Sequence, residues 1–259
     1  MQLNLQFNFN RFWHLIKNDV VTNYRTLLTA AGAALGILLF INFISMLSAS
    51  EPAVALVFYP LILFIGGYLI TSMSFSDLHH PQRSYVYLTL PASNLEKFLS
   101  KLVLTTVGYV LATLILYFLF SVLMSTVNLI IFQENHPLFN PFNRIIWITI
   151  GVYLITQSIF MVGAVYFRKH AFIKINLFLF IVQIALALFA VILVKLVFIG
   201  YFEGWQFNFH DIKLPSLAVE QQLENFFWGF AQFMKFLFYW VLAPVLWLVS
   251  YFRLKETEA

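Results

Sequence analysis

Few residues in this chain could do chemistry, and the densest group lies in one short segment. Asp77, His79 and His80 stand within four positions, and carboxylate and imidazole groups at such spacing can ligate a metal or move a proton. Two adjacent histidines point to different sides of a helix or strand, however, and no second cluster completes a metal shell. The chain also has no Cys. We therefore expect solvated loop residues here, with no metal site and no catalytic residue.

Motifs for the common soluble chemistries are absent from the sequence. It contains no G-x-x-x-x-G-K-[ST] phosphate loop, no H-E-x-x-H and no G-x-S-x-G. The chain is therefore not expected to be an enzyme by itself or to hold a cofactor of its own.

Composition points to a membrane. The 259 residues are 61% hydrophobic and 10% charged, with a mean hydropathy of +0.85. Soluble domains are usually about 45–50% apolar and about 25% charged. The net charge of +4 is spread thinly, so nucleic acid is not an expected partner, and the bilayer is.

Stretches without Asp, Glu, Lys or Arg predict where the chain crosses the bilayer. A helix needs about 20 apolar residues to cross a hydrocarbon core of about 30 Å. The runs are continuous and do not alternate, which favours helices over a barrel. The prediction is an all-α polytopic protein, a single transmembrane domain over 1–259. Its six spans lie at about 27–47, 53–75, 102–131, 145–167, 174–199 and 230–252.

Lys and Arg predict the orientation. Eleven of them flank the spans on one side and four on the other, in an order that alternates correctly through all six spans. We therefore expect a multi-pass protein of the inner (plasma) membrane with both termini in the cytoplasm. A cleaved signal peptide is not expected, because 26 mostly polar or amphipathic residues precede the first apolar run.

The segment of about 5–25 predicts an amphipathic helix. Phe9, Trp13, Ile16 and Tyr24 recur near helical spacing, with basic residues on other faces. We expect it to lie in the cytoplasmic interface of the membrane. The alternative is a helix packed on another part of the protein.

The longest cytoplasmic connection is predicted at 77–101. Ser93 and Glu96 form a capping-box pattern, so a helix should begin near Asn94 and continue as the third span. Upstream lies a mixed polar and aromatic surface that should rest on lipid or dock on a protein partner. Its candidate residues are Asp77, His79, His80, Arg83, Tyr85, Tyr87 and Leu88.

Small and polar residues inside the spans suggest contacts. Gly32 and Gly36 form a GxxxG pattern that suits close helix packing or a dimer face. Asn42, Gln183 and Lys235 are candidates for lining a pathway. Gln157 and Asn176 could likewise either form interhelical hydrogen bonds or line a pathway. Lys195 and Lys235 either snorkel to the outer interface or face a cavity.

Two further features concern the shape of the spans and the long external loop. Pro60 and Pro244 predict kinks in the second and sixth spans. The external loop 201–229 either caps the outer mouth of a pathway or carries an interfacial helix with no role in transport.

This order of parts resembles the permease subunits of type 2 ABC (ATP-binding cassette) exporters. The run from Leu90 to Lys101 is similar to that family's "LP-[small]-S-x-x-E-x-x-x-x-K" signature. The resemblance implies an amino-terminal elbow helix on the membrane and a loop, near 77–90, that contacts a separate ATPase holding ATP and Mg²⁺. It also implies a second permease copy, identical or not, with spans 1, 2 and 5 facing the dimer axis.

Two other classes remain open. A membrane enzyme would have to use Asp77, His79 and His80, and an assembly subunit would bind another membrane complex and move nothing. A carrier driven by protons or sodium is disfavoured, because the six charge-free windows hold no acid. The expected cargo is lipophilic, amphipathic or peptide-like and is exported, but its identity is open.

Overall fold

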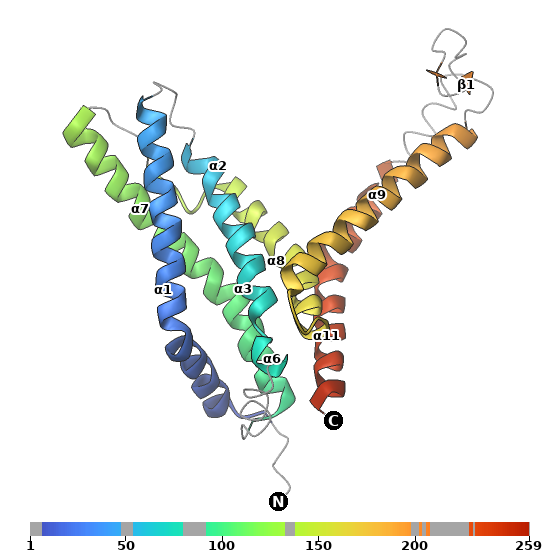
Figure 1. The fold of residues 1–259 in the computed structure, drawn as a ribbon, viewed down its shortest axis with the longest axis horizontal. Coiled ribbons are helices and arrows are strands. Elements are labelled where there is room, and N and C mark those ends of the chain that lie inside the picture. Colours follow the sequence, from blue (N-terminus) through green and yellow to red (C-terminus); the bar gives the residue numbers. More distant parts are fainter. Residues whose placement is uncertain are drawn as a thin grey trace, which may run out of the picture. The chain divides into compact units, whose positions relative to one another are not determined.

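The computed structural model describes residues 7–47, 54–79, 92–132, 138–197, 202–203, 206–207, 228–229 and 231–258. Nearly all of these residues are helical, as predicted (Figure 1). The exceptions include two short strands, β1 (Phe202–Glu203) and β2 (Gln206–Phe207), which pair antiparallel. The chain divides into two compact units, Met1–Phe172 with Ala243–Ala259, and Ile173–Leu242.

Most of the described helices belong to the first unit. Regular helix alternates there with two wider π-helical turns, η1 and η2. In chain order the elements are α1 (Phe9–Leu47), α2 (Val54–Leu61), η1 (Ile62–Gly66), α3 (Gly67–Met73), α4 (Ser76–His79), α6 (Asn94–Val103), η2 (Leu104–Gly108), α7 (Tyr109–Phe132) and α8 (Arg144–Tyr166). Two further helices, α9 (Ala171–Val197) and α11 (Leu242–Glu258), begin in one unit and end in the other.

Helix α1 covers both the predicted elbow helix and the first predicted span. It is one continuous helix of 39 residues, with no break between 25 and 27. No Gly or Pro occurs between Phe9 and Ala31, so nothing in the sequence interrupts the helical hydrogen bonds there. At 1.5 Å per residue α1 is about 58 Å long, nearly twice a hydrocarbon core.

Five helical segments are long and apolar enough to cross a membrane, by length and composition. They overlap the first, third, fourth, fifth and sixth predicted spans and identify a membrane-embedded helical protein. The segments are Phe9–Phe40, Asn94–Ile130, Arg144–Tyr166, Ala171–Leu193 and Ala231–Glu256. The second predicted span is helical from Val54 to Met73. Its apolar helical part, Phe58–Met73, is shorter than the other five segments. A sixth crossing therefore stays a prediction.

The exposed surface has the character expected when lipid is the solvent. Along α9, large apolar side chains such as Leu177, Phe180 and Leu186 are each about 60% exposed. In water a surface of this kind would be covered, because apolar area is costly to hydrate. In a bilayer it needs no cover.

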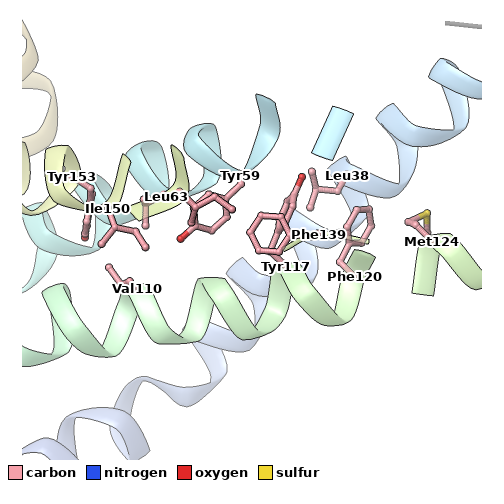
Figure 2. Packing of buried hydrophobic residues seen from close by; sticks show 11 residues of the cluster. Leu38, Tyr59, Leu63, Val110, Tyr117, Phe120, Met124, Phe139, Ile150 and Tyr153 are labelled. Carbon is pink, nitrogen blue, oxygen red and sulfur yellow. The ribbon is translucent and has the colours of Figure 1, made fainter. Parts of the chain in front are cut away.

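Two clusters of buried residues hold the first unit together. In one, Tyr59, Tyr117 and Phe139 pack their rings edge-on or tilted, with centroids 4.8–5.5 Å apart (Figure 2). Leu38 of α1 joins this cluster, so α1 packs against the other helices of the unit. The second cluster gathers Phe75, Phe98, Met161, Ala164, Val165 and Leu254.

Regular helix is interrupted beside both predicted kink sites. The turn η1 begins two residues after Pro60, and a third π-helical turn, η5 (Leu237–Val241), ends three residues before Pro244. Proline has no N–H, so Pro244 cannot hydrogen-bond the carbonyl of Trp240 as an ordinary helical residue would. A wider turn is one way a helix accommodates such a gap.

Candidate functional site

A capping box marks the start of α6, near the end of the loop predicted to contact a partner. Ser93 lies in an extended conformation before α6, and its Oγ accepts a hydrogen bond from the N–H of Glu96 at 3.2 Å. Glu96 in turn accepts one from the N–H of Ser93 at 2.9 Å through Oε2. The reciprocal pair expected from the sequence is therefore present, and α6 begins at Asn94.

The second carboxylate oxygen of Glu96 is bound by the start of the chain. Its Oε1 accepts a hydrogen bond from the N–H of Asn8 at 2.6 Å and lies 3.0 Å from the guanidinium of Arg11. The Glu96 side chain is fully buried, whereas about a third of the Arg11 side chain is exposed. One carboxylate thus joins two segments that are far apart in sequence.

Glu96 lies before the third predicted span, 102–131, in the first turn of a helical segment, Asn94–Ile130, that is about 55 Å long and so exceeds a hydrocarbon core. Burial by itself raises the pKa of the Glu96 carboxyl. The hydrogen bonds from Asn8, Ser93 and Arg11, with the charge of Arg11, outweigh burial and hold the pKa below its ordinary value of 4.5. Glu96 is therefore ionised at neutral pH.

A second ion pair joins the same two helices further along. The ammonium of Lys101 lies 2.8 Å from Oδ1 of Asp19, and both side chains are mostly buried. We call Arg11, Asp19, Glu96 and Lys101 the α1–α6 clamp. Two pairs at separate positions along α1 fix both the position and the direction of its first turns against α6.

Neutral polar side chains meet deeper in the first unit. Gln157 of α8 is fully buried, and its Nε2 donates to the hydroxyl of Thr105 at 3.0 Å and to that of Thr71 at 3.3 Å. These three residues, the polar layer, come from α8, η2 and α3. Among the described residues, nothing donates a hydrogen bond to Oε1 of Gln157.

Two tyrosines compensate for the wide turns beside this layer. A π-helical turn shifts the hydrogen-bonding register, so carbonyls there lose their usual partners. The hydroxyl of Tyr109 donates to the carbonyl of Ile62 in η1, and that of Tyr153 donates to the carbonyl of Thr105 in η2, both at 2.7 Å. A buried carbonyl in a bilayer needs such a partner.

Two adjacent glycines make these contacts possible. A Cβ atom at Gly66 would overlap the hydroxyl of Tyr109, and one at Gly67 would overlap the ring of Tyr153. The tyrosines can reach across only because both positions lack a side chain. Sequence reasoning missed this site, although the Gly66-Gly67 pair inside a predicted span was a usable signal.

The polar layer can orient helices but holds no group that would titrate near neutral pH. Within the part of the chain that the structure describes, no three His, Asp or Glu residues are grouped as metal ligands would be. The sequence allowed two roles for Gln157, an interhelical hydrogen bond or a place in a pathway. In the structure it forms interhelical hydrogen bonds.

Most residues predicted to contact a partner fall outside the described residues. Asp77 and His79 belong to the short helix α4, but their side chains are not described. The others lie wholly outside, namely His80, Arg83, Tyr85, Tyr87 and Leu88.

The predicted packing and pathway residues do not come together in the described chain. A Cβ added at Gly32 or Gly36 would meet nothing within 4 Å, so this face of α1 packs on no other described part of the chain. Gln183 and Lys235 are exposed, and Asn42 lies in α1 with its side chain outside the description. The dimer face and the pathway stay predictions.

None of the protein-family models, curated proteins or solved structures compared with this chain matches it.

Proposed function

We propose that this chain is the transmembrane permease subunit of an ABC transporter. It would move a lipophilic, amphipathic or peptide-like substrate out of the cytoplasm, across the inner membrane in which both its termini face the cytoplasm. A separate ATPase subunit would bind ATP and Mg²⁺ and supply the work. The observation that carries the proposal is the α1–α6 clamp, two of whose residues, Glu96 and Lys101, lie at the end of the predicted loop 77–101.

Force applied to that loop would reach three helices. Helix α4 lies at the start of the predicted loop, and α6 begins near its end after the capping residue Ser93. At its base Phe75 and Phe98, both buried, stack with ring centroids 6.4 Å apart, which ties the end of α3 to α6. The clamp then ties α6 to α1. A partner that moves the loop would therefore move the inner ends of α1, α3 and α6 together, which a permease requires for alternating access.

The surfaces left open by the single chain agree with a second permease copy. The Gly32–Gly36 face of α1 is unpacked among the described residues, and α9 is exposed along most of its length. These helices correspond to the first and fifth spans, which the resemblance places at a dimer axis. Lipid covers the same faces equally well, so they support the proposal less than the clamp does.

Purification in mild detergent with mass spectrometry of the associated chains tests the proposal. We expect an ATPase to co-purify with the wild-type chain and to be lost in Tyr85→Asp and Tyr87→Asp variants that still reach the membrane. His14→Asp, an exposed position on α1, is the matched control and should retain the ATPase.

Two results would overturn the assignment. One is co-purification of an ATPase that neither loop variant disturbs. The other is a wild-type chain that never carries an ATPase but does carry another membrane complex, which would identify an assembly subunit.

A further inference from the structure

The turn between α8 and α9 presents positive charge. Only four residues, 167–170, separate the two helices, and His170 adopts a left-handed conformation with φ of 54° that turns the chain sharply. The side chains of Arg168 and Lys169 are exposed on this turn.

The end of α11 lies against the end of α8 and adds to this charge. Leu254 is fully buried in the cluster that contains Val165 of α8. Next to it, the guanidinium of Arg253 lies 5.2 Å from the ring centre of Tyr166, the last residue of α8. Lys255 is exposed one residue further on. Two segments more than 80 residues apart thus form one basic patch, consisting of Arg168, Lys169, Arg253 and Lys255.

Little negative charge balances this patch. No Asp or Glu occurs between Glu134 and Glu203, a range that contains the whole α8–α9 turn. Among the described side chains of the two segments the single acid is Glu256, which lies 2.7 Å from Arg253. Among the described side chains, Arg168, Lys169 and Lys255 form no ion pair with a carboxylate, and their positive charge favours an anionic partner.

The position of the patch along the helices indicates which anion it meets. Tyr166 and Phe252 are 59% and 57% exposed, and Val249 is exposed one turn before Phe252. These side chains belong to helices long and apolar enough to cross a membrane, so they face acyl chains. The basic residues begin where this apolar surface ends, at the depth of the headgroups.

We propose that Arg168, Lys169, Arg253 and Lys255 form a binding site for the phosphate headgroup of an anionic phospholipid. Tyr166 and Phe252 contact the upper part of its acyl chains. Basic residues between helix ends are a recurrent way for membrane proteins to hold such lipids. The site does not depend on the transport function, because it needs only a chain embedded in a bilayer.

Native mass spectrometry of the detergent-purified full chain, titrated with phosphatidylglycerol or phosphatidylcholine, tests this site. A basic residue near an anionic surface contributes about fivefold in affinity. An Arg168→Gln/Lys169→Gln variant should therefore bind phosphatidylglycerol about 25-fold more weakly than wild type and phosphatidylcholine equally well. An Arg144→Gln/Lys235→Gln variant removes the same charge elsewhere and should bind phosphatidylglycerol like wild type.

Three outcomes would overturn the proposal. The first is an Arg168→Gln/Lys169→Gln variant that binds phosphatidylglycerol unchanged, and the second is an equal loss in the Arg144→Gln/Lys235→Gln variant, which would show a general effect of charge. The third is displacement of phosphatidylglycerol by excess inorganic phosphate, which would identify a free anion as the ligand. Thermal unfolding of each variant checks that a loss of binding is not a loss of fold.

Discussion

The guanidinium of Arg11 lies 3.0 Å from the carboxylate of Glu96, although 85 residues separate them in the chain. Glu96 also closes the capping box that starts α6. The same side chain therefore sets where α6 begins, near the end of the predicted loop 77–101, and where the first turns of α1 lie. Any motion of this loop that displaces α6 must either carry α1 along or break the pair.

Removing Glu96 should be far more costly than removing an exposed partner of the same kind. Glu96→Ala removes the carboxylate that accepts hydrogen bonds from Arg11 and from two backbone N–H groups, so we expect a loss of about 2–3 kcal/mol in the free energy of unfolding. Glu256→Ala breaks a pair of similar length whose side chains are 45% and 65% exposed, and should cost at most about 0.5 kcal/mol. Unfolding in mixed micelles measures both, and equal losses would contradict the importance of burial.

The contribution of Glu96 should depend on pH in a defined direction. Its pKa in the folded chain is below 4.5, so the unfolded chain takes up the proton first as the pH falls. The stability that the ionised carboxylate adds is fully present above pH 4.5 and is lost as the pH falls through the lower folded pKa. The difference in unfolding free energy between wild type and Glu96→Gln should therefore be constant near pH 7 and shrink below pH 4.5. A difference that grew on acidification would contradict this.

The hydroxyl of Tyr153 should contribute measurably to the stability of the folded chain. Tyr153→Phe keeps the aromatic packing but removes the hydrogen bond that the hydroxyl donates to the carbonyl of Thr105 in a buried wide turn. We expect a loss of about 0.5–1.5 kcal/mol, the usual net contribution of one intramolecular hydrogen bond. Tyr166→Phe, at an exposed position, should change stability by less than about 0.5 kcal/mol. The two variants are compared by thermal unfolding in the same detergent.

Two glycines of the spans should respond in opposite ways to the same change. Gly67→Ala places a methyl group in the ring of Tyr153 and should destabilise the chain by about 1–3 kcal/mol, because helices α3 and α8 must separate. Gly32→Ala meets nothing within 4 Å and should be neutral or stabilise by up to about 1 kcal/mol through helix propensity.

The same pair of variants also tests the predicted dimer face. If Gly32 packs on a second copy, Gly32→Ala should weaken self-association measured by cross-linking in membranes, even though it does not destabilise the chain itself. Unchanged self-association would remove Gly32 from that face.

Helical structure and its placement could be predicted from the sequence because both depend on local properties. Charge-free runs set where five of the helices lie, and Ser93 with Glu96 sets the residue at which α6 begins. The continuity of α1 from the predicted elbow helix into the first span follows from the sequence in the same way. Its first turns are amphipathic and its remainder apolar, yet no residue between them breaks the helix.

Pairing between distant segments is what only the tertiary structure decided. Arg11 is one of the basic residues of the amphipathic segment, and nothing local in the sequence indicates that it pairs with Glu96 or that Asp19 pairs with Lys101. Likewise Gly32 and Gly36 had the better-known pattern, but Gly66 and Gly67 make the close contacts. Hydropathy and capping act within a few residues along the chain, whereas an ion pair or a close contact depends on which helix faces overlap, and that is set by the packing of the whole unit.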